Sequence, residues 1–189
     1  IEAGVALGEE EFIAGGVRAF AYEHECLDEV RGNWPDFRTH ASGPDGTPSS
    51  MIAWCHGAPG IGLARLRALT LIPEHEDAPT WRAELEIAMT TTIAAPLGPL
   101  DHLCCGNLGR AAVLRIAGLE TGRAQWVQAA DQLTAVVLDR AAHDGGYQFP
   151  YDGPDATGAP APGFMNGFAG VGAHVLTLQS GEHLGDVLS

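Results

Sequence analysis

One short motif occurs three times in this sequence and organises the rest of it. The copies are Trp54-Cys55-His56-Gly57-Ala58-Pro59-Gly60-Ile61-Gly62, Leu103-Cys104-Cys105-Gly106-Asn107-Leu108-Gly109-Arg110-Ala111 and Phe164-Met165-Asn166-Gly167-Phe168-Ala169-Gly170-Val171-Gly172. Each copy reads x-x-G-x-x-G and continues into an apolar segment of about three helical turns. The first glycines of successive copies are 49 and 61 residues apart. A period of about 50 residues is typical of a repeated helical hairpin with its connections.

The segments around the motifs predict two kinds of helix. Apolar residues recur at three- and four-residue steps, as in helices with one buried face, in three segments: Glu9 to Leu27, Trp81 to Ile93 and Ala124 to Arg140. The segments that follow the motifs are apolar nearly all round, as buried helices are: Ile61 to Ile72, Leu108 to Gly118 and Phe168 to Leu178. The sequence therefore predicts an all-α fold in which buried inner helices alternate with amphipathic outer helices.

Little of the chain favours β-structure. Residues 32–50 are rich in Gly, Pro, Asp and Ser, and they predict a loop that Trp34 and Phe37 hold to the core. Residues 147–151 could form a short extended segment, but Pro150 argues against a central strand.

Composition excludes several classes of function. The chain has 189 residues and a net charge of −14, and its ten basic residues are all arginine. Without lysine it can form neither a Schiff base nor a phosphate-loop contact, and so acidic a surface repels a nucleic-acid backbone. No apolar run reaches the roughly 18 residues of a membrane span. Four cysteines are too few for a disulfide scaffold of this size, so they favour a reducing compartment and predict a cytoplasmic location.

Three of the cysteines occupy related positions in the repeats. Cys55 and Cys104 stand at the same place in successive motifs, and Cys105 follows Cys104. If the repeats pack side by side, the starts of the inner helices lie together and these thiols converge. Adjacent residues on a regular helix point about 100° apart, so Cys104 and Cys105 can bind one ion together only if they lie on an irregular turn, which Gly106 and Gly109 permit. Helix N-termini also lower thiol pKa values, which favours thiolate ligands.

Three sulfur ligands suit zinc and leave one coordination position open, as in catalytic rather than structural zinc sites. Zinc ionises a bound thiol near neutral pH, and three thiolates on the metal keep a fourth sulfur nucleophilic. The predicted site, Cys55 with Cys104 and Cys105, therefore favours activation of a substrate thiol over activation of water.

Other interpretations of the cysteines and histidines stay open on spacing alone. Cys26, on a predicted outer helix, is interpreted as a small residue of the hydrophobic core. A vicinal Cys104–Cys105 disulfide would be strained. A purely structural zinc could take His56 or His102 as its fourth ligand, since each lies close to a cysteine in the sequence.

The motifs at residues 54–62, 104–110 and 166–172 resemble those of the lanthionine synthetase C-like family, in the expected order over essentially the whole chain. The resemblance is greatest to the C-terminal cyclase domain of class II lanthipeptide synthetases. It implies an α/α toroid with zinc at one mouth, held by Cys55, Cys104 and Cys105. Many members have Cys-His where this chain has Cys-Cys.

The resemblance also implies a reaction and its partners. A cysteine of a dehydrated precursor peptide, activated by zinc, adds to the β-carbon of dehydroalanine or dehydrobutyrine, and a lanthionine or methyllanthionine thioether results. A dehydratase domain is expected upstream in the parent chain. The family's proposed general acid–base histidine has no match here, so the catalytic residue remains unassigned, with His56 as a weaker substitute.

The register of the repeats predicts that the chain begins part-way through the domain. Gly122 closes the second unit 16 residues after Gly106, and Gly8 matches it as the turn of an earlier unit. The chain is then expected to start inside an inner helix, with residues 1–189 forming the C-terminal portion of a single cyclase domain.

Two further functions compete with a zinc-dependent cyclase. One is a zinc-stabilised, non-catalytic peptide-binding module. The other is a glycan-processing α/α toroid, which would need paired carboxylates near the helix ends. Asp36 and Asp101 are the candidates for such a pair, and neither has a convincing partner in the sequence.

Overall fold

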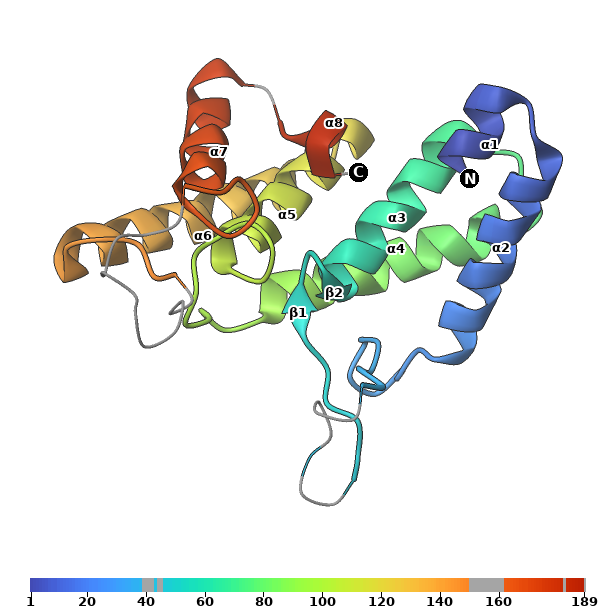
Figure 1. Cartoon of the computed structure of the whole chain (residues 1–189), viewed down its shortest axis with the longest axis horizontal. Helices are drawn as coiled ribbons and strands as arrows, with labels where there is room; N and C mark the ends of the chain where they lie inside the picture. Colours follow the sequence, from blue (N-terminus) through green and yellow to red (C-terminus); the bar gives the residue numbers. More distant parts are fainter. Residues whose placement is uncertain (39–42, 44–45, 150–161, 182, 189) are drawn as a thin grey trace.

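The protein is a series of helical hairpins, shown by a computed structural model that describes residues 1–38, 43, 46–149, 162–181 and 183–188 (Figure 1). The helices are α1 (Glu2–Leu7), α2 (Glu10–Glu25), α3 (Ala58–Leu71), α4 (Ala78–Ala94), α5 (Asn107–Thr121), α6 (Ala124–Asp144), α7 (Phe168–Ser180) and α8 (Gly185–Leu188). The predicted all-α fold is confirmed. The described residues also include a two-stranded hairpin of β1 (Ile52–Ala53) and β2 (His56–Gly57).

The helices alternate between two layers, as the sequence predicts. Helices α1 and α2, α3 and α4, and α5 and α6 pair as hairpins, and α1, α3, α5 and α7 contact one another in that order. Figure 1 shows these hairpins following one another across the molecule, from α1 and α2 in blue to α7 in red. Helix α5 is the most enclosed, with every residue from Asn107 to Gly118 buried. The start of α5 therefore lies between two other repeats, which is where the motif turns gather.

Two helices are less buried than their apolar content predicts. No residue of α2 is buried, and Phe12 is 54% exposed, although Phe20 packs edge-on against the buried Trp81. On α7, Phe168 and Leu176 are exposed. Each helix stands at one end of the series and has a neighbouring repeat on one side only, so one apolar face lacks a partner among the described residues.

The loop that follows α2 is held to the core by one of the two predicted aromatic side chains. Trp34 is buried and its Nε1 donates to the Glu23 carbonyl at 2.9 Å. Phe37 is 59% exposed, so the prediction that it also holds the loop is wrong. The extended segment predicted at residues 147–151 is described only to residue 149, where Gln148 pairs with Asp101 and no strand forms.

A buried histidine gives the fold a pH dependence. His174 on α7 is 1% exposed, its Nε2 lies 3.0 Å from Thr134 Oγ1, and burial lowers its pKa to about 4, helped by the charge of Arg115. An unfolded histidine has a pKa of about 6.5, so between these values the unfolded state binds more protons and stability falls as the pH falls. His102, whose pKa burial also lowers, acts in the same direction.

We expect the free energy of unfolding, measured in urea, to be lower at pH 5 than at pH 7, by about 2 kcal/mol for His174 alone. His174→Gln keeps a polar group beside Thr134 and removes the titration, so it should reduce this difference. An unchanged pH dependence in that variant would contradict the assignment.

Candidate metal site

The second glycine of each motif lets a backbone carbonyl cross the first turn of an inner helix. A Cβ atom at that glycine would lie 1.8 to 2.0 Å from the carbonyl oxygen of the residue six positions earlier. The three pairs are Gly60 with Trp54, Gly109 with Leu103 and Gly170 with Phe164. No side chain fits at this approach, so the repeated glycines fix the turn that precedes each inner helix.

Backbone hydrogen bonds join the three turns at equivalent positions. The Cys55 N–H donates to the Cys104 carbonyl at 3.3 Å, and the Cys104 N–H donates to the Met165 carbonyl at 2.9 Å. Cys55, Cys104 and Met165 each stand two residues before the first glycine of their motif. The turns therefore lie side by side, although the residues that form them are far apart in the chain.

This arrangement brings three sulfur atoms together. Cys55 occupies the two-residue turn of the β1–β2 hairpin, and Cys104 and Cys105 lie just before α5 begins. The Sγ atoms of Cys55 and Cys105 are 3.1 Å apart, those of Cys104 and Cys105 are 3.5 Å apart, and all three lie within 4.8 Å of one another. Ligands 2.3 Å from a tetrahedral zinc ion are about 3.8 Å apart. The three cysteines could thus hold a metal ion with little movement.

The pKa values of Cys104 and Cys105 differ in direction from the sequence expectation. Burial raises the pKa of Cys105, as do its contacts with Cys55 and Cys104, and burial likewise raises the pKa of Cys104. The helix N-terminus is expected to lower these pKa values, but the close packing of the thiols removes them from water and raises the pKa values by more. The cluster therefore needs a cation to hold more than one thiolate, which suits a metal site rather than a free nucleophile.

Neither histidine that could complete a structural site joins the sulfur cluster within the described part of the chain. The buried His102 ring faces its own turn, where Nδ1 accepts from the Cys105 N–H at 3.4 Å. The His56 Nε2 lies 3.4 Å from Asp36 Oδ1, without hydrogen-bond geometry.

The structure also answers two other questions about the cysteines, where Cys26 lies and whether Cys104 and Cys105 form a disulfide. Cys26 stands outside the cluster and packs, half-buried, against the main hydrophobic core. Cys104 and Cys105 are free thiols, so the strained vicinal disulfide does not form.

The two carboxylates considered for a glycan-processing site both stabilise loops. Asp101 is fully buried and accepts from the Gln148 N–H at 2.8 Å and from Asn107 Nδ2 at 3.0 Å, besides its ion pair with Arg140. Asp36 is 1% exposed and accepts from Arg38. Each carboxylate forms an ion pair with an arginine, whereas a glycan-processing site needs two carboxylates that act as a pair.

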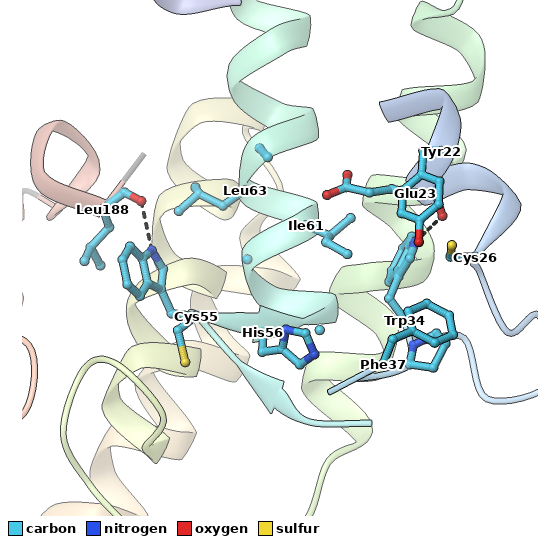
Figure 2. A pocket seen from close by; sticks show the side chains of 15 residues that line it. Tyr22, Glu23, Cys26, Trp34, Phe37, Cys55, His56, Ile61, Leu63 and Leu188 are labelled. Carbon is cyan, nitrogen blue, oxygen red and sulfur yellow. Dashed lines mark hydrogen bonds between the residues drawn. The ribbon is translucent and has the colours of Figure 1, made fainter. Parts of the chain in front are cut away.

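An apolar cavity of about 420 Å³ borders Cys55. Figure 2 shows it between the end of α2 and the start of α3, with His56 and Phe37 at one edge and Leu188 at the other. The sulfur of Cys55 points away from Ile61 and Leu63 in this view, so the cavity lies beside the sulfur cluster and does not enclose it.

Sequence reasoning missed two polar residues that shape this region. Asn33 Oδ1 accepts from the Ala58 N–H at 2.8 Å and its Nδ2 donates to the Met51 carbonyl at 3.0 Å, which fixes the hairpin that carries Cys55. Arg38 was not singled out either, because nothing in its local sequence distinguishes it from the other nine arginines.

Stacked helical hairpins define an α/α repeat protein, and the cysteines at the starts of its inner helices could hold a metal ion. A family model described as lanthionine synthetase C-like protein matches residues 8–188. The chain therefore belongs to the lanthionine synthetase C-like family, as its motifs indicate. In the part of the chain that the structure describes, no helix has both the length and the apolar character to cross a membrane.

Proposed function

We propose that this chain carries the metal centre of a zinc-dependent lanthipeptide cyclase. The observation that supports this most directly is the approach of the Cys55, Cys104 and Cys105 sulfurs to within 4.8 Å of one another. In the proposed reaction, a peptide cysteine loses its thiol proton and its sulfur bonds to the β-carbon of dehydroalanine or dehydrobutyrine. The α-carbon then takes up a proton, which leaves a lanthionine or methyllanthionine thioether.

The donor set fits zinc and a thiol substrate. Three sulfurs match the preferences of zinc and leave one of its four usual positions for a further ligand. Zinc held there would lower the pKa of a peptide thiol that binds beside it. Cys55 is exposed, so a peptide can approach the cluster from its side. The neighbouring cavity, lined by Trp34, Trp54 and Ile61 among others, can accept an apolar side chain of that peptide.

The context of the chain is part of the same proposal. We propose that residues 1–189 form the C-terminal portion of one cyclase domain of the class II type, with a dehydratase domain upstream and a cytoplasmic location. Exposed apolar side chains on the first hairpin, such as Leu7 and Phe12, support a further packed repeat beside it. The general acid–base group is then supplied by that further repeat.

Cobalt substitution separates a cyclase from a zinc-stabilised binding module. Cobalt(II) in an open three-sulfur site should change its visible spectrum when a cysteine-containing peptide is added, because a fourth sulfur joins the metal. A serine version of the same peptide should leave the spectrum unchanged. A spectrum that does not respond to the cysteine peptide would favour the closed, structural site.

A further inference from the structure

Arg38 is fixed near the hairpin that carries Cys55 by a buried carboxylate. Asp36 is 1% exposed and its backbone N–H donates to the Ser49 carbonyl at 2.6 Å, so its position is set by the loop. The Arg38 Nε donates to both Asp36 carboxylate oxygens, at 2.8 and 3.0 Å, and Nη2 bonds to the same group. The Arg38 backbone N–H also donates to Asp36, at 3.0 Å. Such a two-pronged pair orients the guanidinium far better than a flexible surface lysine would be oriented.

The neighbours of Arg38 place it close to the hairpin that carries Cys55. Its Nη2 lies 3.8 Å from the Met51 sulfur, at the base of the hairpin whose turn carries Cys55. Asp36 lies 3.4 Å from the ring of His56, the residue after Cys55. The pKa of Arg38 is raised, chiefly by its hydrogen bonds to Asp36, and Cys55 and Cys105 raise it further when they are thiolates. Within the described residues, Arg38 Nη1 has no acceptor, and the side chain is about half exposed.

The negative charge expected at the metal site is what makes a nearby arginine important for ligand binding. A divalent cation held by three thiolates carries a net negative charge, and the chain as a whole carries −14. An incoming peptide thiolate is therefore repelled by the cluster that must bind it. A fixed cation beside the hairpin that carries Cys55 offsets this repulsion as the thiolate approaches.

We propose that Arg38, oriented by Asp36, is a positioning residue that favours anionic ligands, and above all the peptide thiolate, at the open position of the sulfur cluster. This inference rests on the proposed zinc site. It assigns specificity for charge to a loop outside the three repeated motifs.

The test compares two ligands on the cobalt-loaded chain. The first is a capped cysteine peptide without charged side chains, which binds as a thiolate, and the second is imidazole, which binds as a neutral molecule. Arg38→Gln can still donate to Asp36 but carries no charge, so it should weaken peptide binding about fivefold and leave imidazole binding unchanged. Arg38→Lys keeps the charge but loses the two-pronged pair with Asp36, so its peptide affinity should lie between those of Arg38→Gln and the unmodified protein. Adding 0.5 M salt should reduce the difference between Arg38→Gln and the unmodified protein.

Arg31→Gln is the matched control. Arg31 makes the same kind of local pair, donating from its backbone and its side chain to Asp28, and it changes the net charge equally. The affinity of the Arg31→Gln variant for both ligands should match that of the unmodified protein. Equal peptide affinity in Arg38→Gln and the unmodified protein would overturn the inference, as would a parallel loss of imidazole binding, which indicates a merely structural role. If the unmodified protein fails to bind the peptide at all, the proposed function itself is wrong, and this inference with it.

Discussion

Replacing Cys105 by alanine should lower zinc affinity by more than about a hundredfold and abolish thioether formation. Cys105 is the central sulfur of the cluster, 3.1 Å from Cys55 and 3.5 Å from Cys104. Loss of a group that merely orients a metal ligand costs 10- to 100-fold in affinity, so loss of a ligand should cost more. Competition with a chromogenic chelator measures the affinity, and mass spectrometry after thiol alkylation counts the rings formed.

Cys26→Ala is the control for this experiment. Cys26 lies outside the cluster, so zinc affinity and cyclisation should both be unchanged. Zinc binding at full strength in Cys105→Ala, or its loss in Cys26→Ala, would remove the basis of the proposed site.

Replacing Gly109 by alanine should disrupt the same site although all three cysteines are retained. The added methyl group would lie 1.8 Å from the Leu103 carbonyl oxygen, in the turn that carries Cys104 and Cys105. Because backbone stands on both sides of this contact, the turn must move, and we expect a loss of about 3 kcal/mol in the free energy of unfolding. Zinc affinity should fall with it, since both cysteines would be displaced.

Gly172 offers a matched control within the third motif. It lies inside α7, and a Cβ atom there would meet nothing within 4 Å. Alanine is preferred to glycine inside a helix, so Gly172→Ala should be stabilising by up to about 1 kcal/mol. Urea unfolding gives the change in the free energy of unfolding for Gly109→Ala and for Gly172→Ala. Equal changes in the two variants would show that the carbonyl contact at Gly109 is unimportant.

The repeated motifs and the helical periodicity predicted most of the architecture. Apolar spacing located each long helix to within a few residues, because burial on one face leaves a period in the sequence. The inner helices begin earlier than expected, at Ala58 and Asn107, because each starts directly after the first glycine of its motif. The approach of Cys55 to Cys104 and Cys105 followed from a single assumption, that repeats of one sequence stack in register.

What the sequence could not predict depends on contacts between distant segments. Asp36 was considered as a catalytic carboxylate, whereas the structure pairs it with Arg38 and seats it beside His56. The predicted direction of the Cys105 pKa shift was wrong, because this pKa depends on how closely the three thiols pack together, which no local sequence pattern encodes. The exposed face of α2 likewise depends on which neighbours are present, and its own residues do not reveal this.

The hydrogen bonds that run from Cys55 to Cys104 and from Cys104 to Met165 have a consequence for the segments between the motifs. The intervals between the first glycines are 49 and 61 residues, yet the bond across the longer interval is the shorter one, at 2.9 against 3.3 Å. The twelve additional residues of the longer interval accordingly leave the contact between neighbouring motif turns unchanged. The segments between the motifs therefore tolerate different lengths within one chain while the turns that carry the cysteines stay in register.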